Sequence, residues 1–129
     1  MPRLDCSFRA ATTLLLPHAD MAWARSAVWI AERPSGGLCG FLETSIRPYA
    51  EGSEAQPVGY IEGWYVDPDV RRHGVGRALV VAAEEWVRSL GCRQMASDAE
   101  IENGVSIEAY VAIGYREVGR VVHFSKDLG

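Results

Sequence analysis

Residues 66–79 read VDPDVRRHGVGRAL, and this stretch decides how the rest of the sequence is interpreted. A strand-like segment leads into a basic turn with two glycines, Gly74 and Gly76, and a long amphipathic pattern begins at Val75. Free backbone N–H groups and the helix dipole make a helix start an anion site, and glycines let a phosphate approach closely. Taken alone, the two glycines fit an ordinary helix start equally well. Neither a Walker loop nor a dinucleotide-binding fingerprint is present.

The pattern after this turn predicts the clearest helix of the chain. Apolar residues recur at helical spacing from Val75 to Leu90, and Gly91 follows where a helix cap favours a left-handed residue. A second helix is expected over 106–113, closed by Gly114. A short helix over 10–16, ended by Pro17, is expected near the start.

Strand signals surround these helices. We expect a hairpin from 27–31 and 38–47 around a turn at 33–37, strands at 60–66 and 92–97, and a terminal hairpin from 115–118 and 121–125. This order predicts an α/β (mixed α+β) fold, with a mostly antiparallel sheet and crossover helices.

Composition limits the classes of function. The 129 residues, 48% of them hydrophobic, fit a single domain over 1–129. The net charge of −4 argues against nucleic acid or an anionic membrane as main partner and permits a cationic ligand. No apolar run approaches the ~20 residues of a membrane span. The N-terminus resembles a signal peptide only loosely, because Thr12-Thr13 and 17–20 interrupt its apolar part, so a cytoplasmic location is expected.

Two motifs resemble the GNAT superfamily of N-acetyltransferases. Arg-x-x-Gly-x-Gly at 71–76, after a strand and Val66-x-Pro68, resembles its acetyl-CoA loop. Asn103-x-x-Ser106-x-x-x-Tyr110-x-x-x-Gly-Tyr resembles its second helix signature, with Ser and Tyr in place of Ala and Phe. The resemblance spans about 27–128. It implies a GNAT fold with a splayed pair of parallel strands.

Two further segments narrow the resemblance to the aminoglycoside 6'-N-acetyltransferases. They are YIEGWYV at 60–66 and GCRQMASD at 91–98, followed by Glu102-Asn103. The resemblance implies direct acetyl transfer from acetyl-CoA to a primary amine, the 6'-amine of an aminoglycoside, as a resistance enzyme. An N-acetyltransferase for another amine (a polyamine, a small metabolite or a peptide N-terminus) and a non-catalytic CoA-binding module are the alternatives.

The resemblance also implies how CoA is held. The basic turn would bind the pyrophosphate, the splayed strand end would pair with pantetheine amides, and the start of the second helix would anchor pantetheine. The cofactor-binding residues expected on this basis are Trp64, Tyr65, Val66, Arg71, Arg72, His73, Gly74, Val75, Gly76, Arg77, Asn103 and Ser106. We expect His73 to face solvent, with no catalytic role.

Three residues are expected to be catalytic. Glu62 lies mid-strand, where an unpaired carboxylate is costly, so it is either hydrogen-bonded structure or a site group. The resemblance makes it the group that binds the amine and accepts its proton, with a pKa raised by desolvation. Asp98 would face the same cleft or cap a turn, and which carboxylate is the base stays open. Tyr110 would protonate the departing thiolate, although a Tyr on an apolar helix face also fits a core.

Other expectations concern partners, metals and cysteines. No metal is expected, because His18, His73 and His123 lack ligand spacing. Three cysteines without a Cys-x-x-Cys pair make a disulfide framework unexpected. Compared with the family, no first strand is expected before residue 27, so the N-terminal elements are expected to be shortened. A shortened lobe, a truncated reading frame and a partner subunit that completes the surface are the alternatives. We expect a homodimer.

Overall fold

The computed structural model describes residues 7–15, 25–54 and 56–129. Internal contacts divide the chain into two compact units, Met1–Asp98 and Ala99–Gly129.

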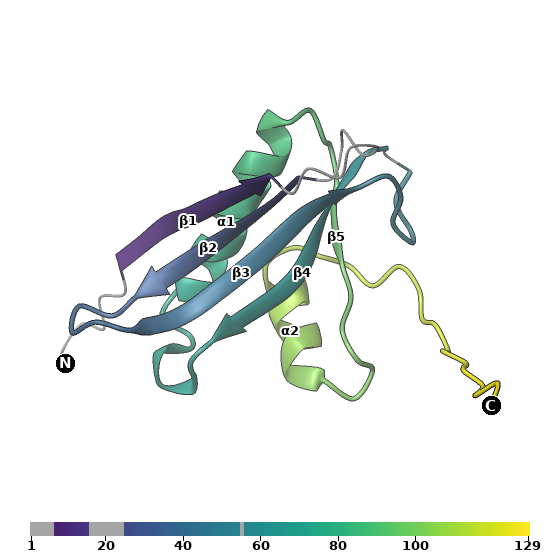
Figure 1. Cartoon of the computed structure of the whole chain (residues 1–129). Coiled ribbons are helices and arrows are strands. Elements are labelled where there is room, and N and C mark those ends of the chain that lie inside the picture. Colours follow the sequence, from purple (N-terminus) through teal and green to yellow (C-terminus); the bar gives the residue numbers. More distant parts are fainter. Residues whose placement is uncertain (1–6, 16–24, 55) are drawn as a thin grey trace. The chain divides into compact units, whose positions relative to one another are not determined.

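The first unit is built on one five-stranded sheet with the spatial order β1-β2-β3-β4-β5 (Figure 1). The strands are β1 (Ser7–Leu15), β2 (Arg25–Glu32), β3 (Leu38–Arg47), β4 (Val58–Val66) and β5 (Met95–Ser97). Neighbours pair antiparallel from β1 to β4, and β5 pairs parallel to β4. The predicted mixed, mostly antiparallel sheet is confirmed.

Strand β1 corrects two expectations about the N-terminus. The segment predicted as a helix over 10–16 is instead a strand over Ser7–Leu15, antiparallel to β2, so a first strand does precede the hairpin. A seven-residue helix is too short to be stable alone, whereas pairing with β2 satisfies backbone groups along one side of the segment. Thr12-Thr13 also favour a strand, since β-branched residues pack well on a pleated surface. Residues 16–24, including Pro17 and His18, lie outside the described residues.

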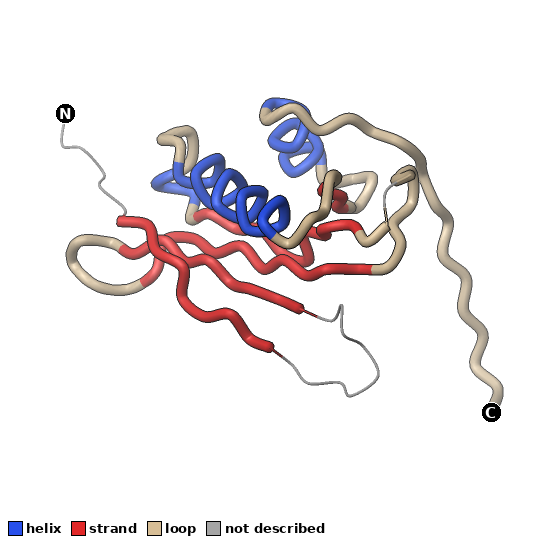
Figure 2. The backbone as a smooth tube through the Cα atoms, turned by 90° about the horizontal axis from the view of Figure 1, so that it is seen from above, coloured by secondary structure: helices blue, strands red, loops and turns tan. Residues whose placement is uncertain are grey.

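Helix α1 (Val75–Ser89) covers one face of the sheet (Figure 2). Its buried residues are Leu79, Val80, Ala83 and Val87, and all of them except Val80 are among the apolar residues whose helical spacing predicted this helix. Gly59 of β4 allows this close packing, because a Cβ there would lie 2.5 Å from Val87 Cγ1. The helix ends before Gly91, whose φ of 88° confirms the predicted left-handed cap.

A β-bulge interrupts the pairing of β3 with β4 at Glu62. Glu43 is paired with Gly63 and Thr44 with Ile61, so Glu62 is the extra residue with no partner across the ladder. A bulge shifts the alternation of side chains by one position beyond it. Trp64, opposite buried Leu42, therefore lies on the helix-covered face, while Glu62 lies on the opposite, open face with Ser45.

The parallel strands β4 and β5 separate where the bulge in β4 begins. Their pairing ends at Ile61 and Ser97, where the Ser97 hydroxyl donates to the Ile61 carbonyl at 3.0 Å. Residues 62–66 of β4 continue without a described strand on that side. The splayed pair implied by the resemblance is confirmed.

The second unit contains helix α2 (Gly104–Ala112). The Asn103 side chain caps its start by accepting from the Ser106 N–H at 3.1 Å. Gly114 has a φ of 97° after the helix, as its predicted closing position requires. The predicted terminal hairpin over 115–125 is wrong, because residues 115–129 form neither strand nor helix. Two short strands alone are marginal in water, and no described strand pairs with them.

Two of the cysteines lie in the core, and one of them corrects an expectation. Cys92 is buried and free, and burial raises the pKa of its thiol. Cys39 is also buried but is disulfide-bonded. The spacing of cysteines in the sequence does not by itself identify a disulfide.

None of the described helices combines the length and the apolar character that a membrane span requires.

Candidate functional site

The first turn of α1 presents free backbone donors. Gly74 precedes the helix with a φ of 84°, and the first helical hydrogen bond runs from the Ala78 N–H to its carbonyl at 3.0 Å. The N–H groups of Val75, Gly76 and Arg77 therefore have no acceptor within the helix. Together with the positive end of the helix dipole, they form a site suited to an anion such as a phosphate.

Trp64 and Gly76 bring the end of β4 against this turn. A Cβ on Gly76 would lie 3.1 Å from Trp64 Cζ2 and 3.4 Å from a methyl group of Val66. The glycine therefore lets the helix start approach the strand closely. This contact depends on the bulge at Glu62, because without it Trp64 would lie on the other face of the sheet.

The basic residues of the turn have different environments. The Arg71 Nε donates to the Val66 carbonyl at 2.9 Å, and its guanidinium lies 5.9 Å from the Tyr65 ring centre. Arg71 is thus tied to the end of β4. Arg72 has an unusual positive φ of 65°, and His73 and Arg77 are exposed. The exposure of His73 agrees with the expectation that it faces solvent.

Glu62 is held by two residues of β3. The Ser45 hydroxyl donates to Oε1 at 2.6 Å, Arg47 Nε donates to Oε1 at 2.8 Å, and Arg47 Nη2 donates to Oε2 at 2.6 Å. An ionised carboxylate accepts about four hydrogen bonds, two on each oxygen. Oε2 therefore retains one acceptor position, and the Glu62 side chain is 27% exposed. One further cationic or N–H donor can bind there.

The expectation of a raised pKa for Glu62 is wrong for this state. Burial raises the pKa of the carboxyl, but the hydrogen bonds from Arg47 and Ser45 and the charge of Arg47 outweigh burial and leave the pKa below its ordinary value. Desolvation was inferable from the sequence, whereas the paired arginine was not. Glu62 is consequently a persistent negative group near neutral pH, suited to bind an ammonium.

Replacing Arg47 with Gln tests this assignment. Burial then acts with only the Ser45 bond against it, so we expect the pKa of Glu62 to rise. The titration of the Glu62 side-chain carboxyl, followed by carbon NMR, measures the shift. Arg93→Gln, which removes an exposed arginine elsewhere, serves as the control and should leave the curve in place.

The same change alters how stability depends on pH. Because the folded-state pKa of Glu62 is lowered, its contribution is present above the unfolded-state pKa and is lost as pH falls through the folded-state value. Arg47→Gln should therefore remove the part of the acid-induced fall in Tm that Glu62 causes. An unchanged Glu62 titration in the variant would contradict the assignment.

Arg47 also connects Glu62 to Asp98. Its guanidinium carbon lies 3.6 Å from the centre of the Tyr60 ring, and the Tyr60 hydroxyl donates a short hydrogen bond to Asp98. Burial, followed by this hydrogen bond, raises the pKa of Tyr60 above its ordinary range. The result is a cluster in which one cation lies among two carboxylates and an aromatic ring, on the open face beside the splayed strands.

The structure thus brings together two of the three predicted catalytic residues, Glu62 and Asp98. Tyr110, Asn103 and Ser106 belong to the second unit, where the rings of Tyr110 and Tyr115 lie with centroids 5.6 Å apart. The sequence reasoning missed a group of supporting residues: Ser45, Arg47 and Tyr60. A polar face at alternate positions of the predicted 38–47 strand was the available signal.

In the part of the chain that the structure describes, no group of three or more His, Cys, Asp or Glu side chains is arranged to hold a metal ion.

The fold and the anion site can be compared with known proteins. Residues 3–115 match the model of the acetyltransferase (GNAT) family. The chain belongs to this family. The GNAT match begins before residue 27, where the resemblance was expected to start, so it includes the region of β1. It ends at 115 and does not include the segment in which the predicted hairpin is missing.

Several relatives of this GNAT chain share the same description. An aminoglycoside N(6')-acetyltransferase type 1 of Klebsiella aerogenes is 50% identical over 103 residues, which are 80% of this chain and 68% of the relative. One of Stenotrophomonas maltophilia is 43% identical over 110 residues, 84% of this chain and 72% of the relative.

Solved structures agree with these relatives. The aminoglycoside acetyltransferase AAC(6')-Iy, in complex with the bisubstrate analogue CoA-S-monomethyl-acetylneamine, matches with a TM-score of 0.74 and 38% identity over 79% of this chain and 69% of that one. The 6'-N-acetyltransferase AAC(6')-Ih of Acinetobacter baumannii matches with a TM-score of 0.75 and 35% identity over 81% and 71%.

Proposed function

We propose that this protein transfers the acetyl group of acetyl-CoA to the 6'-amine of an aminoglycoside, as a resistance enzyme. The observation that carries the proposal is Glu62, which offers a free acceptor position on the open face where β4 separates from β5. A relative described as an aminoglycoside N(6')-acetyltransferase is 50% identical over 80% of this chain. We also propose that residues 1–129 form one acetyltransferase domain.

Acetyl-CoA fits the groups at the start of α1 and along β4. The N–H groups of Val75, Gly76 and Arg77 would bind the pyrophosphate, with positive charge from Arg72 and Arg77. The backbone of 64–66, beyond the splay, would pair with the pantetheine amides as an added strand does. Asn103 already caps α2 through its side-chain oxygen, so contacts of Asn103 with pantetheine would use its amide nitrogen.

The acceptor fits the carboxylates of the open face. Glu62 would bind the ammonium at its remaining acceptor position and take its proton, directly or through water. The neutral amine would then attack the thioester carbonyl, forming the C–N bond while a strand N–H stabilises the oxyanion. The C–S bond would break, and the thiolate would take a proton from Tyr110. The nitrogen would lose its second proton, which returns to Tyr110 through solvent, and Glu62 would release its proton to solvent. The products are the acetamide and free CoA.

Turnover on a panel of aminoglycosides tests the proposal. Acetyl-CoA is mixed with kanamycin or tobramycin, free thiol is followed with a chromogenic reagent, and the acetylated position is read by NMR. Kanamycin carrying a 6'-hydroxyl in place of the amine is the matched control and should give no thiol. If the protein binds CoA but releases no thiol with either kanamycin or tobramycin, the proposed acceptor is contradicted.

Two other functions remain as outcomes of the same assay. Turnover of a polyamine or a peptide N-terminus without turnover of aminoglycosides would indicate an N-acetyltransferase for another amine. CoA binding without turnover on any amine would indicate a non-catalytic CoA-binding module.

We also propose a cytoplasmic location, from the interrupted apolar pattern near the N-terminus, and a homodimer, from the family resemblance. Cell fractionation tests the location. Light scattering on the purified chain, over a range of concentrations, tests the dimer.

A further inference from the structure

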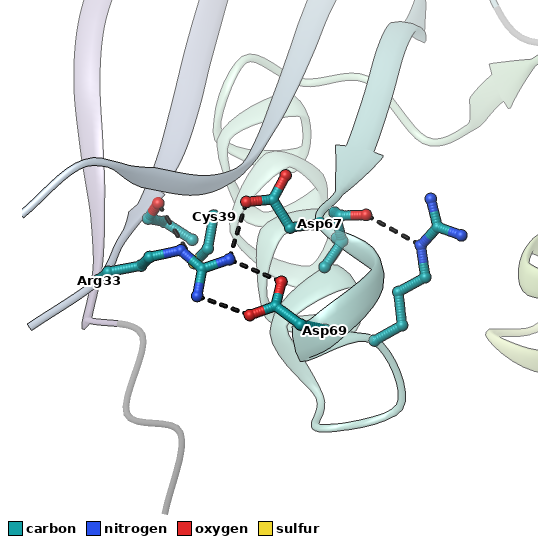
Figure 3. Close-up of polar contacts among 7 residues, drawn as sticks. Arg33, Cys39, Asp67 and Asp69 are labelled. Atoms are coloured by element: carbon teal, nitrogen blue, oxygen red, sulfur yellow. Dashed lines mark hydrogen bonds and ion pairs between the residues drawn. The ribbon is translucent and has the colours of Figure 1, made fainter.

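Arg33 joins two loops that are far apart in the sequence. It begins the turn between β2 and β3, where its N–H donates to the Gly37 carbonyl at 2.9 Å. Its guanidinium donates to both oxygens of Asp69, at 2.8 and 2.7 Å, and to Asp67 at 2.9 Å (Figure 3). One planar side chain therefore bridges two carboxylates, one of them in the two-pronged geometry that an arginine favours.

We call residues 67–70, between the end of β4 and the turn at 71–74, the stem. Both carboxylates belong to it. Asp67 directly follows β4, and its N–H donates to the Cys39 carbonyl at 2.7 Å. A short 3-10 helix, Pro68–Val70, carries Asp69 and buries Val70 completely. On the other side of this stem the turn continues over residues 71–74 into the free N–H groups of the α1 start.

We propose that Arg33 is a positioning residue for the CoA-binding turn. It holds the stem so that the turn at 71–74 and the first N–H groups of α1 are arranged for the pyrophosphate before CoA binds. This inference rests on the proposed function, because it takes the anion at the α1 start to be CoA. The physical reason is that a loop already held in its bound conformation loses less conformational entropy on binding.

An isolated exposed ion pair would have little effect, because its attraction is screened and it orders two mobile side chains. Three features distinguish this one. The Arg33 guanidinium makes three hydrogen bonds, the side chain is only 27% exposed, and the stem has further anchors in buried Val70 and in the Asp67 N–H. The bridge therefore adds to a segment that the backbone already holds at one end.

Arg33→Gln is the first test, with CoA itself as the probe. We expect the Kd for CoA, measured by calorimetry without an acceptor, to rise about fivefold to tenfold. The KM for acetyl-CoA should rise similarly, while the KM for the aminoglycoside changes by less than about twofold. Arg120→Gln, which breaks the exposed pair of Arg120 with Glu117, is the control and should leave the Kd unchanged. A lower Tm with an unaltered Kd would overturn the proposal.

A second variant separates positioning from simple charge. Asp67→Asn with Asp69→Asn also breaks the bridge, but it removes two negative charges near the anion site. If Arg33 only neutralised those charges, the double variant would bind CoA as tightly as the wild type or more tightly. Positioning predicts that it binds CoA more weakly, as Arg33→Gln does. Tight binding by the double variant would therefore overturn the proposal.

The outcome is independent of the acceptor. If the wild type does not bind CoA, the proposed function itself fails. If the wild type and both variants bind CoA equally well, only the role of Arg33 fails.

Discussion

Glu62→Gln is expected to lower kcat/KM for the aminoglycoside by about 100-fold, within the range usual for loss of a general base. The amide is isosteric and can still accept from Ser45, but it carries no charge and takes no proton. Both the binding of the ammonium and the removal of its proton are therefore affected. Steady-state kinetics at fixed, saturating acetyl-CoA measures the change, and the KM for acetyl-CoA should stay within about twofold.

Two further variants are compared with Glu62→Gln. Glu43→Gln removes a carboxylate from an exposed residue paired with Gly63, the next residue after Glu62, and should have little effect. Asp98→Asn decides between the two candidate bases. If Asp98→Asn causes the loss and Glu62→Gln does not, the assignment of the base to Glu62 is wrong.

Tyr110→Phe is expected to lower kcat by about 100-fold, with little change in the Kd for CoA. Only the hydroxyl is lost, so the departing thiolate loses its proton donor while the ring remains on α2. The expected signature is a loss in the transfer step measured by rapid mixing of saturated enzyme. A small effect on kcat would place Tyr110 in the structure and not in the reaction.

Tyr115→Phe is the control for that measurement. The ring of Tyr115 lies 5.6 Å from that of Tyr110, centroid to centroid, so both variants remove a hydroxyl from the same pair of rings. Phe is also the residue of the family signature at this position. We expect activity within about twofold of the wild type, and an equal loss in both variants would contradict a specific role for Tyr110.

Much of the fold was predictable because its signals are local. The helical spacing from Val75 and the left-handed position of Gly91 gave the long helix, and the bounds 38–47 of one strand agree with the structure. The N-terminal strand and the missing terminal hairpin were not predictable in this way. In both cases the outcome depends on a partner strand, which is present for β1 and absent among the described residues for 115–129.

The same distinction applies to the candidate site, where local signals identified some residues and contacts between strands decided the rest. Glu62 and Asp98 stood out as carboxylates in and after strands, and the glycines and arginines of 71–77 stood out as a basic helix start. Arg47 was missed as the partner of Glu62, so the direction of the pKa shift was predicted wrongly. An unpaired carboxylate and a paired one look the same in a sequence, and they differ only in which strand lies beside them.

The sequence by itself determined the anion-binding turn, the helix that follows it, the two candidate carboxylates and the family. These features depend on residue type and on spacing along a few turns of chain. Only the tertiary structure decided the pairing of Arg47 with Glu62, 15 residues apart, and of Arg33 with Asp69, 36 residues apart. It also placed the bulge at Glu62. Strand register sets these contacts, and a shift of one residue in register moves a side chain to the other face of the sheet.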